Sequence, residues 1–124
     1  MNQNQLPAEP ADLYLGLGNL VYALAKIDNG VDAHESKAAQ QVLKKQPYGR
    51  LALHAFFLLE NCEATPEEAY AFAMRRFGSN RSALTQPVRS QFITLLITIA
   101  DASGGMSQKE QQFIDQFRHD LDLL

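Results

Sequence analysis

The sequence has very few of the residues that build disulfide frameworks or thiolate metal sites. Its 124 residues include 1 cysteine, Cys62. One thiol cannot form an internal disulfide, and it cannot hold a zinc ion without further ligands. We expect Cys62 to be a small, partly buried apolar residue.

Basic clusters and long apolar runs are also missing. The formal net charge is -3, whereas nucleic-acid binding and polybasic membrane anchoring both need clustered lysines and arginines. Lys44-Lys45 and Arg75-Arg76 fall at expected helix C-termini, where cations complement the helix dipole. The longest apolar run, Phe92 to Ala100, contains two threonines, and a membrane-spanning helix needs about 20 apolar residues. We therefore expect no nucleic-acid partner, no membrane insertion and a cytoplasmic location.

Breakers of regular structure are sparse, with 5 prolines and 7 glycines in the chain. Residues 1–9 are polar and aperiodic, without the charged and apolar regions of a signal peptide, and predict a disordered segment. Residues 10–124 predict a single domain, which is long enough to bury roughly two thirds of its unfolded surface.

Apolar residues recur at spacings of three and four through most of the domain, as is typical of amphipathic helices. Capping residues, prolines and glycines mark where each helix begins and ends. The expected helices cover residues 10–28, a stretch from the cap Asp32 to before Pro47, residues 50–60, a stretch from the cap Thr65 to Phe77, a stretch from the cap Thr85 to before Ser103, and a stretch that begins at the cap Ser107. Gly78 is the expected stop of the fourth helix.

The fifth helix is apolar on nearly every face and is expected to be the buried centre of the fold. Its β-branched residues also allow a strand from Phe92 to Ile99. We favour a helix because the pattern is long, starts at a capping signal and lies between other helices. The core is expected to contain the phenylalanines at helical spacing, namely Phe56, Phe57, Phe72, Phe77, Phe92, Phe113 and Phe117.

Two turns share one pattern: an apolar helix ending in aspartate, a glycine, one hydrophobic residue, an N-cap, and a glutamate three residues after the cap. The first turn contains Asp28, Gly30, Val31, Asp32 and Glu35. The second contains Asp101, Gly104, Gly105, Met106, Ser107 and Glu110. Glycine permits the positive φ that ends a helix, expected at Gly30, and the cap with its glutamate forms a capping box. The fold class expected is therefore all-α: a compact bundle of five to seven helices built from two pseudo-symmetric hairpins.

This repeated turn resembles the pattern of the TerB-like family, which includes tellurite-resistance TerB proteins and the N-terminal domain of DjlA-type membrane co-chaperones. The family pattern is a helix, Asp-Gly, a hydrophobic residue, Ser or Asp, and a glutamate that opens the next helix. The resemblance spans residues 11–121. The first turn departs from it at Asn29, and the second is longer before its cap. The resemblance implies an all-helical fold, an acidic surface that has been suggested to bind metal, and no catalytic activity.

If both turns lie on the same side of the domain, their carboxylates can converge on a calcium, magnesium or manganese ion, which prefer hard oxygen ligands. The candidate ligands are Asp28, Asp32, Glu35, Asp101 and Glu110. Capping alone also explains Asp32 and the two glutamates. Asp28 and Asp101 carry more functional weight, because an acid at a helix C-terminus opposes the dipole.

The function expected is that of a non-enzymatic, stress-linked TerB-like domain that binds a divalent cation. The chain has no G-x-S-x-G, phosphate-loop or H-E-x-x-H motif. A protein-interaction or scaffold module without metal is the alternative, and an enzyme with carboxylate chemistry is the third reading.

Overall fold

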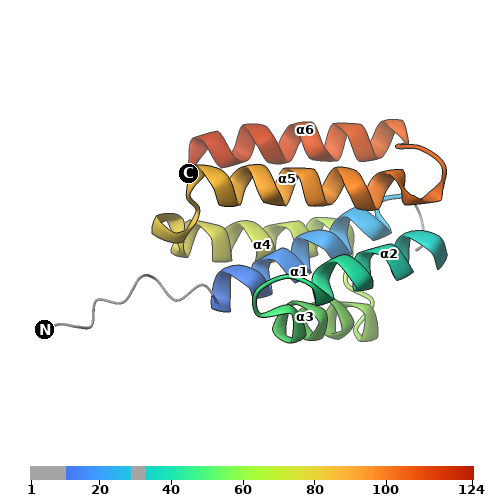
Figure 1. The fold of residues 1–124 in the computed structure, drawn as a ribbon, viewed down its shortest axis with the longest axis horizontal. Coiled ribbons are helices and arrows are strands. Elements are labelled where there is room, and N and C mark those ends of the chain that lie inside the picture. The colour runs from blue at the N-terminus through green and yellow to red at the C-terminus, as the bar shows by residue number, and fades with distance from the viewer. Residues whose placement is uncertain (1–10, 29–32) are drawn as a thin grey trace, which may run out of the picture.

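The computed structural model describes residues 11–28 and 33–124, which form six α-helices and two short 3-10 helices (Figure 1). In chain order they are α1 (Ala11–Lys26), α2 (Ala33–Lys44), α3 (Gly49–Asn61), α4 (Pro66–Ser79), η1 (Arg81–Ala83), α5 (Gln86–Ala100), η2 (Asp101–Ser103) and α6 (Gln108–Leu123). The described residues contain no strand, so the all-α prediction is confirmed. The segment 1–9, predicted to be disordered, lies outside them, as does Gly30. None of these helices is both long and apolar enough to span a membrane.

The predicted helix starts of α4, α5 and α6 are confirmed. Thr65 Oγ1 accepts from the Glu68 N–H at 3.1 Å, while Glu68 Oε1 accepts from the Thr65 N–H at 2.9 Å. Ser107 and Glu110 form the same reciprocal capping box at α6. Thr85 accepts from the Val88 N–H at α5. These caps satisfy backbone donors that have no partner inside their helix.

Two local expectations are wrong. Gly78 does not stop α4, which continues to Ser79, and it has no positive φ. The side chain of Asn80 completes the end instead, since its Nδ2 donates to the Arg76 carbonyl at 2.7 Å. Cys62 is exposed because it is the C-cap that follows α3 and not a member of the packed face.

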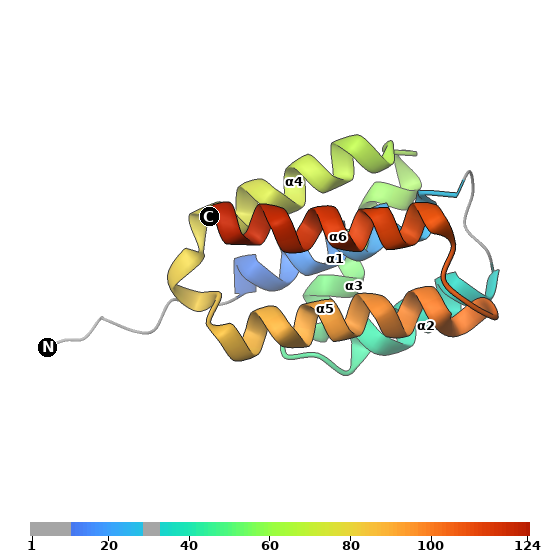
Figure 2. The ribbon, with the colours of Figure 1, turned by 90° about the horizontal axis from the view of Figure 1, so that it is seen from above.

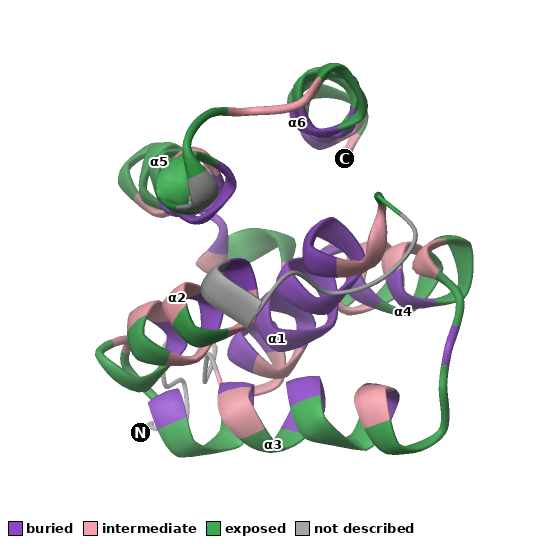
Figure 3. Cartoon of the chain, turned by 90° about the vertical axis from the view of Figure 1, so that its right-hand side faces the viewer, coloured by how far each residue is buried: buried purple, intermediate pink, exposed green. Residues whose placement is uncertain are grey.

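The centre of the fold is α1, so the prediction that the fifth helix is the buried centre is also wrong. Every residue from Leu13 to Ala25 except Leu15 is buried. Figures 2 and 3 show α1 surrounded by the other helices, with α5 and α6 on one side and α3 on the other. On α5 one face is buried, whereas Thr94 and Thr98 are exposed to solvent.

Two glycines in α1 allow α3 and α4 to approach it closely. A Cβ at Gly18 would lie 2.2 Å from the Ala52 carbonyl oxygen of α3. A Cβ at Gly16 would lie 2.9 Å from the Phe77 ring of α4. The central helix must therefore be thin where its neighbours cross it, as well as apolar.

The connection between α3 and α4 is tied to α1 by one buried hydrogen bond. Tyr22 Oη donates to the Ala64 carbonyl at 2.8 Å, and the Tyr22 ring packs edge-on against Phe56. Burial raises the pKa of the Tyr22 phenol, which therefore stays protonated and available as a donor.

The phenylalanines do not all enter the core. Phe56, Phe77, Phe92, Phe113 and Phe117 are buried, as predicted. Phe57 and Phe72 are 37% and 39% exposed, so their assignment to the core is wrong. Helical spacing places a side chain on a face of its own helix, but only the packing of neighbouring helices decides whether that face is covered.

We predict that Gly18→Ala destabilises the fold by about 1–3 kcal/mol, because the added methyl group meets backbone atoms that cannot move without shifting α3. Gly78→Ala is the matched control. Its Cβ would meet only Leu124 at 3.8 Å, and alanine should stabilise the helix interior by roughly 0.5–1 kcal/mol. Urea unfolding measures both variants, and equal effects would contradict the close contact at Gly18.

Candidate functional site

The ends of α1 and α5, from which the two acidic turns start, lie at the same end of the bundle, so the condition for a shared site is met. The helices α1 and α5 pack against each other and run in the same direction, so both end on the side where α2 and α6 begin (Figure 1). The first residues after α5 form η2, which contacts α2. The side chains of the two turns also touch, since Ser107 Oγ donates to Asp28 Oδ2 at 2.8 Å.

Ser107 links the turns because its hydroxyl both accepts and donates. It accepts from the Glu110 N–H at 3.1 Å, which caps α6, and its own proton goes to Asp28. The main-chain N–H of Ser107 donates to Glu110 Oε1 at 2.9 Å. Asp28, at the end of α1, and Glu110, in the first turn of α6, are therefore held by the same serine.

Glu110 is a buried carboxylate, and one of its two oxygens has no hydrogen-bond partner among the described residues. Its side chain is 1% exposed, and Oε2 has no hydrogen-bond partner in the described part of the chain. No described lysine or arginine forms an ion pair with it. The helix dipole at the α6 N-terminus favours its negative charge. A buried acceptor without a donor nevertheless carries a desolvation penalty of about 1–3 kcal/mol, or more when charged.

The other predicted ligands differ in how far they are exposed to solvent. Glu35 is 6% exposed in the first turn of α2. Asp101 is exposed at the C-cap of α5, beside the positive-φ glycines Gly104 and Gly105. Asp32 lies outside the described residues. Across residues 11–28 and 33–124, no three histidine, cysteine or carboxylate side chains form a ready-made metal site. The described geometry joins Asp28 to Glu110 through Ser107.

Comparison with models of known families matches residues 15–123 to the tellurite resistance protein TerB. The chain belongs to the TerB family. The TerB match includes most of α1, both acidic turns and all of α6, so the resemblance inferred from the turns is confirmed. No curated protein and no solved structure matches the chain.

A second feature of this TerB domain was not predicted. Arg76 was assigned to the α4 dipole, but its Nε donates to Asn19 Oδ1 at 3.2 Å and its guanidinium pairs with Asp12. Asp12 also accepts from Asn80 Nδ2 at 2.8 Å. The contact between the start of α1 and the end of α4 borders a groove between α3 and α4. The one sequence signal for it is Asn19, an amide within an otherwise apolar helix.

We predict that Ser107→Ala destabilises the TerB domain more than Thr65→Ala does. Both substitutions remove a cap, each with a cost of about 1 kcal/mol, but only Ser107 also bonds to the other turn. A double-mutant cycle with Asp28→Ala should give a coupling of roughly 0.5–1 kcal/mol. Chemical denaturation measures the four proteins of the cycle and Thr65→Ala, and zero coupling would mean that the Ser107–Asp28 bond contributes nothing to stability.

Proposed function

We propose that this TerB domain is a non-enzymatic module that binds a divalent cation at its two acidic turns. The observation that carries the proposal is the buried, unpartnered Oε2 of Glu110, beside a serine that also holds Asp28. A cation would supply the positive charge that no described lysine or arginine gives to Glu110.

The chemistry of the donors fits a hard cation. The acidic side chains and the Ser107 hydroxyl offer only oxygen, which calcium, magnesium and manganese prefer. Asp28 and Glu110 would anchor the ion, with Asp32, Glu35 and Asp101 as the further candidate ligands. A magnesium ion commonly keeps several waters and uses one or two protein carboxylates, so two anchors are enough for that ion.

Two other readings give different expectations. If the acids act only as helix caps, or if the TerB domain is an interaction or scaffold module without metal, cations leave its stability unchanged. An enzyme would need a reacting group next to a substrate pocket and would show turnover of a substrate whether or not cations change its stability. A cytoplasmic location is part of the proposal, supported by a single exposed thiol, Cys62, which suits a reducing compartment.

We predict that calcium, magnesium or manganese raises the melting temperature of the chelator-treated protein. An ion that binds only the folded state stabilises it by about 1.4 kcal/mol for each tenfold rise in its concentration above Kd. Glu110→Gln should abolish this effect, because it removes the negative charge that would bind the cation. The capping hydrogen bond should remain, since the amide oxygen can still accept from the Ser107 N–H. Because the amide also places a buried NH2 group where Oε2 has no partner, the quantity compared is the change in melting temperature on adding cation, measured for each protein against its own cation-free value.

Glu68→Gln is the matched control, because Glu68 has the same place in the capping box of Thr65 but lies outside the acidic turns. It should keep the full response to cations. Asp28→Asn should weaken the response while keeping an acceptor for Ser107. Melting curves that do not move with any of the three ions would contradict the cation site and leave the acids as caps.

A further inference from the structure

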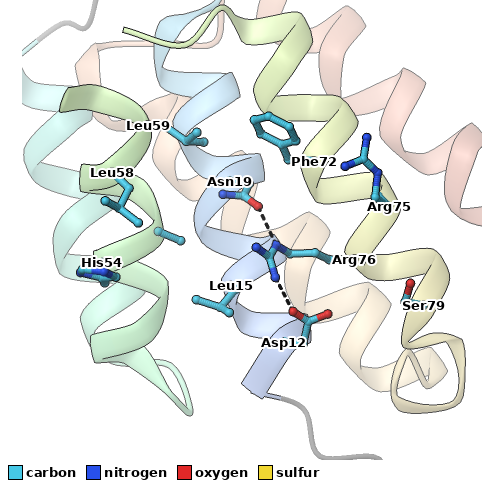
Figure 4. Close-up of a pocket in the computed structure, with 11 residues that line it drawn as sticks. Asp12, Leu15, Asn19, His54, Leu58, Leu59, Phe72, Arg75, Arg76 and Ser79 are labelled. Carbon is cyan, nitrogen blue, oxygen red and sulfur yellow. Dashed lines mark hydrogen bonds and ion pairs between the residues drawn. The ribbon is translucent and has the colours of Figure 1, made fainter. Parts of the chain in front are cut away.

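A groove of about 680 Å³ lies between α3 and α4, away from the acidic turns, with α1 as its floor (Figure 4). We call it the α3–α4 groove. Its α3 wall carries Ala55, Leu58 and Leu59, and Phe72 stands on the α4 wall. Leu58 is 53% exposed and Phe72 39% exposed. Two large apolar side chains thus face solvent from opposite walls of one groove, as is typical of a binding site.

The polar side of the groove is rich in hydrogen-bond donors. On the floor, Asn19 is 5% exposed, and Figure 4 shows its amide nitrogen on the side toward α3. Arg76 is neutralised there by Asp12. Its neighbour Arg75 lies over the Phe72 ring, 5.8 Å from the ring centroid, and pairs with no described carboxylate. The α3–α4 groove therefore carries one unneutralised positive charge in a chain whose net charge is -3.

The groove extends along about two turns of its α4 wall, which is long enough to contact two turns of a bound helix. Phe72, Arg76 and Ser79 follow one another along α4 at spacings of four and three, and all line the groove. At 1.5 Å of rise per residue they extend over about 10 Å, or two turns. An amphipathic helix in such a groove buries side chains at the same spacings from its own apolar face.

We propose that the α3–α4 groove binds an amphipathic helix of a partner protein, whose apolar side chains contact Leu58 and Phe72 and whose carboxylate pairs with Arg75. Charge complementarity selects this occupant, because Arg75 lacks a carboxylate partner next to exposed apolar surface. The groove offers one such arginine and no polybasic cluster, which disfavours an anionic membrane surface. This proposal does not depend on cation binding at the acidic turns.

The test is a display selection of random peptides of roughly 14 residues, about four helical turns, against the immobilised full chain. Enriched peptides should share apolar residues at i, i+3 or i+4, and i+7, together with at least one Asp or Glu. Synthetic copies should shift amide resonances of α3 and α4 in heteronuclear NMR spectra. Enrichment of peptides without the spacing or without the acid would overturn the proposal, as would shifts confined to other helices.

Substitutions in the groove separate the apolar contact from the charged one. Leu58→Asp should weaken binding of the selected peptide roughly tenfold or more, and Arg75→Glu roughly fivefold. A peptide with lysine in place of its acid should bind Arg75→Glu better than it binds the parent. The matched controls are Leu123→Asp and Arg118→Glu, which change exposed residues of α6 and should leave affinity unchanged.

Other occupants give distinct results that would also overturn the proposal. Sedimentation of the chain alone would show a dimer that Leu58→Asp dissociates if the groove binds a second copy. Dodecanoate would displace the selected peptide and bind more tightly than it if the groove is a site for small anionic amphiphiles. Leu58 is half exposed, so its variant should fold, and an unchanged melting temperature verifies this.

Discussion

The fold depends on one constraint, the enclosure of α1 by the other helices. A helix in this position has little surface in contact with solvent, and it must be narrow where its neighbours cross. Its sequence meets the first condition with a run of apolar side chains from Leu13 to Ala25 and the second with Gly16 and Gly18. The single polar interruption, Asn19, accepts a hydrogen bond from Arg76 of α4, whose charge is balanced by Asp12 in the first turn of α1. Both the acidic turns and the α3–α4 groove are arranged around this helix.

Local features of the fold could be predicted from the sequence, and long-range ones mostly could not. The caps at Thr65, Thr85 and Ser107 were predicted correctly because each depends on residues three positions apart. The choice of central helix was wrong because α1 and α5 are both strongly apolar, and helix neighbours decide which one is covered. Exposure of Phe72 was missed for the same reason. Gly78 was mistaken for a stop because the amide that ends α4 belongs to Asn80.

The candidate site shows the same division. Each turn could be read locally, but their common position depends on α1 and α5 packing side by side in the same direction, which only the structure shows. The bond from Ser107 to Asp28 joins residues 79 positions apart, and its donor was recognised only as a cap. The capping box uses only one carboxylate oxygen of Glu110, which accepts from the Ser107 N–H. The other oxygen is buried where no described donor reaches it. No sequence pattern reports that difference, because both oxygens belong to the same carboxylate.

The central place of α1 has a consequence for biosynthesis. The ribosome makes α1 before every helix that covers it, and its covering is complete only with α6, which ends at Leu123. At 5–20 residues per second, the apolar surface of α1 waits for roughly 5–20 s after its own synthesis. During this time the apolar side chains of α1 are exposed to solvent and to any chaperone near the ribosomal exit tunnel. Of the six α-helices in the described part of the chain, α1 therefore waits longest for the neighbours that cover it.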